Sequence, residues 1–290
     1  RSITMKNVFT FLLLLFSLLC NGQSPKLFTT DKELSSSLIN QIYQDRNGFI
    51  WIATEDGLNR YDGAKFTIYK HEPNNEHSLA HNFVRTVFED SKGHLLIGTY
   101  IGIQMYDPAT DNFTPLAKLE DTGETLESNI NSFIERKNGE IWVSGNVLCK
   151  LDIKDHLLTV RKVDIAVTSP GSLFEDKKQN VWMAKGEEGV YQLTPDNQLT
   201  LHLSKDNGYV KSICEDQRGN IYVGSIRKGL FIYDKERKTF VPIDLKEKGE
   251  LPVCFLYSGI PNELYIGTDG KGVVIYNIRT HEISEYKFDN

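Results

Sequence analysis

Three histidines lie close together in the sequence with acidic residues between them, and such a group could bind a metal ion. His71, His77 and His81 share one connecting segment with Glu72 and Glu76. Imidazole and carboxylate groups are common zinc ligands, and a loop can fold them together. A solvated polar loop explains the same residues, and we favour that interpretation. The sequence therefore predicts no metal site.

A second acidic pattern is the four-residue segment Asp-x-x-Gly, which returns at Asp45, Asp90 and Asp216. The Asp boxes of sialidases share it, and Asp45 to Gly48 superficially resembles a calcium loop. The arginine cluster and nucleophilic tyrosine of a sialidase cannot be assigned, however, and the downstream Glu ligand of a calcium loop is lacking. A turn stabilised by its own Asp is the favoured explanation.

Motifs of other enzyme classes are missing from the sequence, which has no GxSxG, HExxH, P-loop or dinucleotide-binding fingerprint. We therefore predict no catalytic residue and no cofactor. The candidate functional residues have to be sought through the elements that position them.

Those elements repeat. Six times the chain returns to an apolar strand, a tight turn, a strand that ends in a large residue, any residue and a small residue, and then a third strand. The large residues are Trp51, Leu96, Trp142, Trp182, Tyr222 and Tyr265, which lie 45, 46, 40, 40 and 43 residues apart. This period is typical of a β-propeller blade. The small residues two positions later indicate where neighbouring blades leave no room, and they are Ala53, Gly98, Ser144, Ala184, Gly224 and Gly267.

The turn between the first two strands has Asp first and Gly fourth in most copies, which is typical of a type I turn with a left-handed fourth residue. The third copy has Arg136 in place of Asp, the fourth has Gln179 in place of Gly, and the sixth has Gly259 in place of Asp. We expect those turns to be shaped differently.

Strands such as 49–53 and 94–98 are nearly continuous apolar runs, which predicts burial on both faces, as in blades that stack around an axis. The fold class is therefore all-β, a β-propeller of four-stranded antiparallel blades that fills residues 23–290. We expect a seven-bladed propeller whose seventh copy lies beyond Asn290, with closure at six blades as the alternative. The six repeats lie near residues 39–69, 83–113, 130–160, 170–201, 209–240 and 252–288.

Propeller ligands usually bind where the connections between second and third strands converge. In this chain those connections carry mixed charges and one aromatic residue, which suit a polyol or an acidic sugar through hydrogen bonds and ring stacking. An ordinary wet loop face would have the same composition. The ligand-binding candidates are Glu55, Asp56, Tyr100, Asn146, Arg227, Lys228, Asp269 and Lys271.

The first 22 residues are typical of a secretory signal peptide, because Lys6 precedes an apolar run of about a dozen residues that is too short to cross a bilayer comfortably. A lipobox at Cys20 is the alternative, although Leu19 is large for that motif. Removal of residues 1–22 takes away Arg1 and Lys6 and no acid, so the formal net charge moves from −6 to −8. We therefore expect no nucleic-acid partner.

The remaining cysteines, Cys149, Cys214 and Cys254, are odd in number and follow no CxxC spacing. Neither a disulfide framework nor a zinc site is indicated. We interpret these residues as small buried apolar side chains.

The residue pattern of the first blades is more specific than the general pattern of propeller repeats. Residues 50–63 read Ile-Trp-Ile-Ala-Thr-Glu-Asp-Gly-Leu-Asn-Arg-Tyr-Asp-Gly, and Phe66, Tyr69-Lys70-His71 and Ser78-Leu79 follow. This wording closely resembles the two-component regulator propeller repeat, most strongly in blades 1, 2 and 5 and least in blade 3.

The resemblance implies the N-terminal periplasmic sensor of a hybrid two-component system. In that family two propellers and a β-sandwich precede one membrane span, a histidine kinase, a receiver and often a DNA-binding domain. It also implies an oligosaccharide ligand, phosphorelay signalling through regions absent from this chain, and anchoring in the inner membrane through C-terminal regions only. A homodimer formed through the full-length sensor is compatible with it. We expect no enzyme activity from this chain itself. The alternatives are a stand-alone secreted propeller enzyme of the lyase type and a structural platform for protein interaction.

Overall fold

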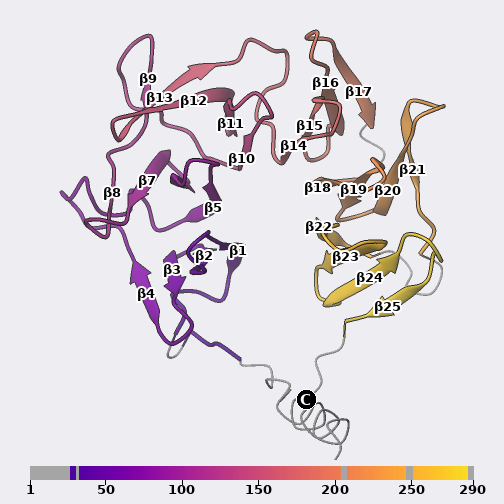
Figure 1. Cartoon of the computed structure of the whole chain (residues 1–290), viewed down its shortest axis with the longest axis horizontal. Helices are drawn as coiled ribbons and strands as arrows, with labels where there is room; N and C mark the ends of the chain where they lie inside the picture. Colours follow the sequence, from indigo (N-terminus) through magenta and orange to yellow (C-terminus); the bar gives the residue numbers. More distant parts are fainter. Residues whose placement is uncertain (1–26, 31–32, 204–207, 246–250, 287–290) are drawn as a thin grey trace, which may run out of the picture. The chain divides into compact units, whose positions relative to one another are not determined.

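The computed structural model describes residues 27–30, 33–203, 208–245 and 251–286, and residues 29–286 form one compact unit. The signal peptide predicted at residues 1–22 lies outside the described residues. Every regular element in the described part of the chain is a β-strand. The strands form six sheets, and all pairs but one are antiparallel (Figure 1). The predicted all-β propeller fold is confirmed.

The first three blades use the following strands. Blade 1 contains β1 (Ile39–Gln44), β2 (Ile50–Thr54), β3 (Gly57–Tyr61) and β4 (Phe66–Tyr69). Blade 2 contains β5 (Val84–Glu89), β6 (Leu95–Thr99), β7 (Ile103–Asp107) and β8 (Asn112–Phe113). Blade 3 contains β10 (Ser132–Glu135), β11 (Ile141–Ser144), β12 (Leu148–Lys154) and β13 (Leu157–Lys162).

The last three blades follow the same order. Blade 4 contains β14 (Leu173–Glu175), β15 (Val181–Ala184), β16 (Val190–Leu193) and β17 (Leu199–Leu203). Blade 5 contains β18 (Val210–Glu215), β19 (Ile221–Ser225), β20 (Gly229–Asp234) and β21 (Thr239–Pro242). Blade 6 contains β22 (Val253–Tyr257), β23 (Glu263–Thr268), β24 (Val273–Asn277) and β25 (Ile283–Glu285).

Blade 3 gains a fifth strand that the repeat did not predict. The long connection from blade 2 contributes β9 (Lys118–Leu119), which pairs in parallel with β13, the outermost regular strand of blade 3. The backbone N–H of Glu120 also donates to the carbonyl of Val160 at 2.9 Å. The connection thus covers an edge that would otherwise present unpaired backbone groups.

Consecutive blades pack against one another through their first strands, in the order β1, β5, β10, β14, β18 and β22, which all lie innermost in Figure 1. The second strands of blades 1 to 5 are buried on both faces, as β6 and β19 show along their whole length, whereas β23 of blade 6 is buried on one face only. The large residues of blades 1 to 5 fill the space between sheets, and Trp51, Trp182 and Tyr222 are at most 1% exposed. Burial of such side chains is the main source of stability in this architecture.

Two faces of the terminal blades lack the cover that internal blades have. Ile42 of β1 is 60% exposed, whereas Val87, at the equivalent position of β5, is 1% exposed. Phe255 of β22 is also 60% exposed, whereas Ser212, its equivalent in β18, is 7% exposed. Among the described residues, one face of blade 1 and one face of blade 6 therefore remain uncovered. The seventh copy predicted from the sequence stays a prediction.

Candidate functional site

The propeller has two axial faces, which we define by their connections. The turn face carries the hairpins between the first and second strands of each blade. The loop face carries the connections between second and third strands and the connections that link one blade to the next. Because strands alternate in direction, these two sets of connections lie at opposite ends of the sheets.

In blades 1, 4 and 5 the Asp of the turn links the turn to the core on the turn face. Oδ1 of Asp45 accepts hydrogen bonds from the backbone N–H groups of Asn47 and Phe49 at 2.9 and 3.0 Å. Its Oδ2 accepts the indole N–H of the buried Trp51 at 2.8 Å. The carboxylate is 8% exposed and has its acceptor sites occupied, so it serves the fold rather than a ligand.

The expectation that blades 3 and 4 would have differently shaped turns is wrong. In blade 3 the bonds from Arg136 N to Glu140 O and from Gly139 N to Arg136 O, both 2.8 Å, repeat the pattern of Asp45 to Phe49. Glu140 supplies the missing carboxylate and accepts the indole N–H of Trp142 at 3.1 Å. In blade 4 Gln179 adopts a φ of 66°, the left-handed conformation that Gly has elsewhere. The backbone thus keeps the same turn shape in blades 3 and 4. In blade 6 the Glu263 N–H donates to the Ile260 carbonyl at 3.2 Å, so that turn differs, as expected.

In each of blades 2 to 5, a glutamate at the end of the first strand binds the turn of the preceding blade. In blade 2, Glu89 accepts the backbone N–H of Arg46 at 2.8 Å and pairs with its guanidinium at 2.6 Å. We call the four residues with this role the inter-blade glutamates; they are Glu89, Glu135, Glu175 and Glu215, which bind Arg46, Ser91, Lys137 and Lys177. This chain of contacts couples the turn of each of blades 1 to 4 to the next blade.

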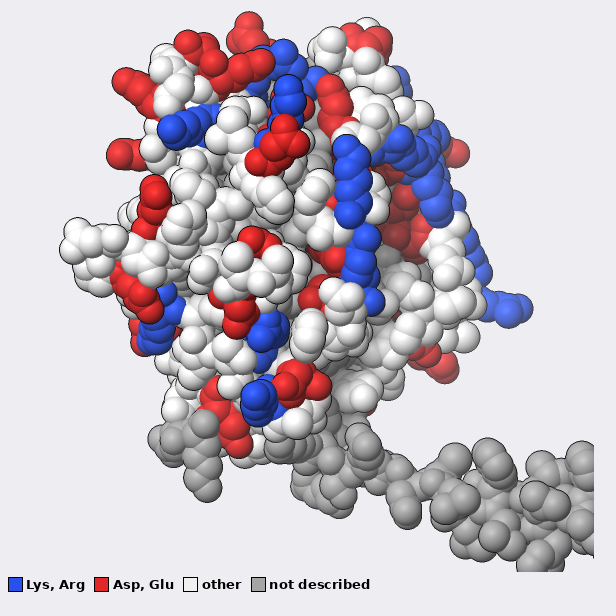
Figure 2. Space-filling model, turned by 60° about the vertical axis from the view of Figure 1, so that its left-hand side comes forward, with Lys and Arg blue, Asp and Glu red and all other residues white. Residues whose placement is uncertain are grey.

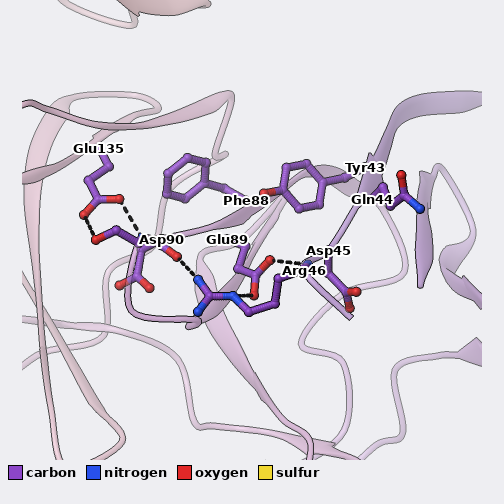
Figure 3. Close-up of a pocket in the computed structure, with 9 residues that line it drawn as sticks. Tyr43, Gln44, Asp45, Arg46, Phe88, Glu89, Asp90 and Glu135 are labelled. Atoms are coloured by element: carbon purple, nitrogen blue, oxygen red, sulfur yellow. Dashed lines mark hydrogen bonds and ion pairs between the residues drawn. The ribbon is translucent and has the colours of Figure 1, made fainter. Parts of the chain in front are cut away.

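These contacts surround a shallow pocket of about 580 Å³ at the junction of blades 1, 2 and 3 (Figure 3). Arg46 extends between Glu89 and Asp90, and its Nη2 donates to the carbonyl of Asp90 at 2.7 Å. Tyr43 and Phe88 line the opposite wall, and burial raises the pKa of the Tyr43 phenol. The acidic side chains around the pocket already hold turns, so the pocket has the character of a structural junction.

A polar and aromatic group joins blades 1 and 2 near their outer strands. The guanidinium of Arg60 lies within 5.7 Å of the ring centroids of Phe49, Trp51, Tyr69 and Tyr106. Asp111 accepts from Arg60 at 3.0 Å, from Tyr69 at 2.6 Å and from Tyr106 at 2.5 Å. Burial raises the pKa of Asp111, but the hydrogen bonds from the two tyrosines and the charge of Arg60 lower it more, so the carboxylate stays ionised. Cation–π and charge-assisted contacts thus fasten these blades.

On the loop face, all eight predicted ligand-binding residues are exposed. Asp56 pairs with Lys70 at 2.5 Å, and Arg227 pairs with Glu187 at 2.9 Å. The backbone N–H groups of Asn146, Lys228 and Asp269 donate to Ser128, Ser225 and Pro252, whereas that of Glu55 donates to Leu38. In these contacts the partners are not themselves among the eight predicted residues. That the eight residues bind a ligand stays a prediction.

Tyr100 belongs to a contiguous group on the loop face that the sequence did not indicate. Its ring is 53% exposed and lies 5.6 Å from the ring of His81 and 6.1 Å from that of Phe83. The guanidinium of Arg85 lies 5.4 Å from the Phe83 ring, and its Nη1 donates to Oδ1 of Asn131 at 3.2 Å. The Tyr100 backbone N–H donates to the Phe83 carbonyl at 3.0 Å, which fixes the two rings relative to each other. In the sequence, the sign that could have indicated this group was the charged Arg85 among the apolar residues of β5.

The histidines of the first inter-blade connection have separate partners. Nδ1 of His71 lies 2.9 Å from the Leu79 carbonyl, and Nδ1 of His77 lies 3.2 Å from the Phe113 carbonyl. Nδ1 of His81 accepts the Phe83 backbone N–H at 2.9 Å. Among the described residues, no group of three or more His, Cys, Asp or Glu side chains has an arrangement that could hold a metal ion.

Charges of both signs are mixed on the surface. Figure 2 shows Lys and Arg interspersed with Asp and Glu on the side that it presents. Within the described part of the chain, no helix is long and apolar enough to cross a membrane.

The family model described as "Two component regulator propeller" matches residues 33–56, 78–100 and 204–227, which belong to blades 1, 2 and 5. These are the blades in which the sequence resembles the family repeat most strongly. "Histidine kinase P4" of Formosa agariphila is 37% identical over 83 residues, which cover 26% of this chain and 6% of that protein.

Solved structures with the same fold include proteins of two kinds. One is described as the extracellular domain of the hybrid two component system BT3049 from B. thetaiotaomicron, with a TM-score of 0.75 and 21% identity over 91% of this chain and 37% of that chain. Another is a virginiamycin B lyase from Staphylococcus aureus crystallised with quinupristin, with a TM-score of 0.68 and 13% identity over 92% of this chain and 88% of that chain. The chain thus spans well under half of the two-component proteins that it matches.

Proposed function

We propose that this chain, three blades of which match the family model described as "Two component regulator propeller", is the periplasmic ligand-sensing propeller of a hybrid two-component system. The match of that family model to three separate blades is the observation that carries the proposal. The similarity to a histidine kinase and to extracellular domains of hybrid two-component systems supports it. The kinase that would receive the signal lies in regions that this chain does not include.

The ligand of this sensor is an oligosaccharide in our proposal, and it binds on the loop face. An exposed aromatic ring at Tyr100 offers a surface for stacking against a sugar, while exposed charged and amide groups on the same face offer hydrogen bonds. The pocket on the turn face is less suited, because its carboxylates already hold backbone and guanidinium groups. Ligand binding would shift the equilibrium between two arrangements of the sensor, and the shift would reach the kinase through domain or dimer geometry.

A lyase-type enzyme has less support. The likeness to virginiamycin B lyase extends over most of both chains but rests on 13% identity, which shows a shared fold alone. Among the described residues, two ion pairs join His to a carboxylate, His94 with Asp90 and His77 with Glu76. Asp90 belongs to a turn on the turn face, and His77 also contacts the outer strand β8.

A thermal-shift screen of the full chain against defined oligosaccharides tests the proposal. A ligand that binds only the native state raises the melting temperature in proportion to the logarithm of its concentration above Kd. We expect a saturable rise for one class of glycan. Silence across a broad panel with a well-folded protein would argue against a glycan sensor and for a protein-interaction platform, whereas cleavage of a panel member would favour the enzyme alternative.

A further inference from the structure

The loop face contains a cationic group whose surroundings differ from those of other shielded arginines in the chain. Arg60 and Arg136 have side chains that are 19% and 14% exposed, and each pairs with a carboxylate. Arg85 is also partly buried, yet no ion pair joins it to Asp or Glu within the described ranges. Its Nε is buried and has no hydrogen-bond partner among the described residues. Partly buried charges are normally paired, because desolvation of an unpaired charge costs free energy.

Arg85 occupies a β-bulge in the innermost strand of blade 2. The pairing of β5 with β6 shifts register between Val84 and Thr86, so Arg85 is the inserted residue. Bulges turn a side chain out of the regular alternation and are frequent beside functional sites. The same bulge occurs in β1, β18 and β22, where the inserted residues are Asn40, Lys211 and Cys254. Because this position accepts such different residues, the repeat itself does not demand an arginine.

The neighbours of Arg85 provide the other parts of a binding site. Phe83 contacts both the guanidinium and the exposed ring of Tyr100, so charge and stacking surface belong to one rigid group. Asn131 orients the guanidinium through Nη1. Two residues before Asn131, on the connection that precedes β10, Oδ1 of Asn129 is also buried and unpartnered among the described residues. Buried polar atoms of native proteins nearly always have a partner, in the protein or in a bound molecule.

We infer that the loop face at blades 2 and 3 binds an acidic sugar, whose anionic group pairs with Arg85 while its ring stacks on Tyr100. A guanidinium binds a carboxylate or a sulfate through paired hydrogen bonds, and an aromatic ring binds the apolar face of a sugar. The inference rests on the proposed function and specifies the class of ligand.

The test compares acidic and neutral forms of one glycan by isothermal titration calorimetry with the full chain. The probes are oligogalacturonates, the same oligomers after methyl esterification, and chondroitin sulfate oligosaccharides. We expect an acidic probe to bind at least tenfold more tightly than its neutral counterpart, because esterification removes the charge and keeps the ring. The affinity for the acidic probe should also fall as the salt concentration rises.

Variants of Arg85 and Tyr100 test whether these residues cause the preference for the acidic probe. Arg85→Gln should remove the preference for the acidic form, Arg85→Lys should keep part of it, and Tyr100→Ala should weaken both forms at least fivefold. The matched control is Arg237→Gln, which changes an arginine with a 73% exposed side chain in the turn between β20 and β21 and should leave affinity unchanged. The melting temperature of each variant shows whether it is folded, and Arg85→Lys keeps the test valid if Arg85→Gln is unstable.

The outcomes separate the inference from the proposed function. Equal affinity for the acidic and esterified forms, or binding of neutral glycans alone, would overturn the inference and leave the sensor proposal standing. An acidic preference that survives Arg85→Gln in a folded protein would overturn the assignment to this group. Binding of no glycan at all would overturn both.

Discussion

Oδ2 of Asp45 accepts a hydrogen bond from the indole nitrogen of Trp51 at 2.8 Å, and Asp176 and Trp182 repeat this bond at the same distance. The Asp that shapes the surface turn is therefore also the partner of the largest core residue of its blade. In blades 1 and 4 one carboxylate therefore links the surface turn to the core.

Replacement of Asp176 by Ala should destabilise the protein by about 3 kcal/mol, because the buried indole of Trp182 and the N–H groups of Lys178 and Asn180 lose their acceptor. Urea denaturation followed by tryptophan fluorescence measures the change. The control is Asp164→Ala, at an exposed position between blades 3 and 4, for which we expect a change below about 0.5 kcal/mol. Equal stability of the two variants would show that the bond to the indole is not important.

Small residues at the ends of the second strands should be essential only where another blade follows. A Cβ added to Gly224 would lie 2.4 Å from Cγ1 of Val253 in blade 6, whereas the nearest atom to one added at Gly267 is 3.3 Å away, in its own blade. Gly224→Ala should therefore cost about 1–3 kcal/mol through overpacking, and Gly267→Ala less than about 1 kcal/mol. Thermal denaturation of both variants gives the comparison. A larger loss at Gly267 would mean that its neighbour is closer than the structure shows.

The left-handed conformation of Gln179 should leave room for a stabilising change. The residue is exposed and has a φ of 66°, which costs free energy for any residue with a Cβ. Gln179→Gly should stabilise the protein by about 1 kcal/mol, and the backbone carbonyl that accepts from Arg136 would be kept. Gln179→Ala is the matched control and should not stabilise. Chemical denaturation measures both, and a loss of stability with Gly would argue for a role of the glutamine side chain.

The three cysteines of the propeller should differ in reactivity. Burial raises the pKa of the Cys149 thiol to about 11 and that of the Cys214 thiol to about 12, so neither forms a thiolate at neutral pH, and both are shielded. Cys254 is only partly buried, in the exposed first strand of blade 6. At pH 8 a thiol-specific reagent should therefore modify Cys254 rapidly, and the other two only after denaturation. Rapid reaction of Cys149 in the native protein would contradict the burial described here.

The sequence predicted the blades well because each repeat specifies its own strands through local patterns. The periodic large and small residues, exemplified by Trp51 and Gly98, indicate packing between blades that recurs wherever another blade follows. Contacts between repeats were harder to foresee. The pairing of Glu89 with the turn at Arg46 depends on how adjacent blades are offset, and β9 depends on where a long connection returns.

The candidate site illustrates the same limit. Tyr100 was predicted because it lies in the connection between the second and third strands of blade 2. Arg85 lies at the start of a first strand and Phe83 in the connection before it, where no ligand-binding residue was expected. Only the bulge in β5 and the backbone bond between Tyr100 and Phe83 bring these side chains together. Apart from the charge of Arg85 among the apolar residues of β5, the sequence carries no sign of either feature.

The central claim is that the loop face binds the ligand and the turn face holds the blades together. Hydrogen–deuterium exchange of the full chain, with and without the glycan that raises the melting temperature most, tests this claim directly. We predict that the ligand slows exchange in residues 81–85, 99–102 and 128–131 and leaves residues 45–48 and 90–93 unchanged. Protection confined to the turn hairpins around the Arg46 and Glu89 pocket, or no protection at either face, would contradict the account.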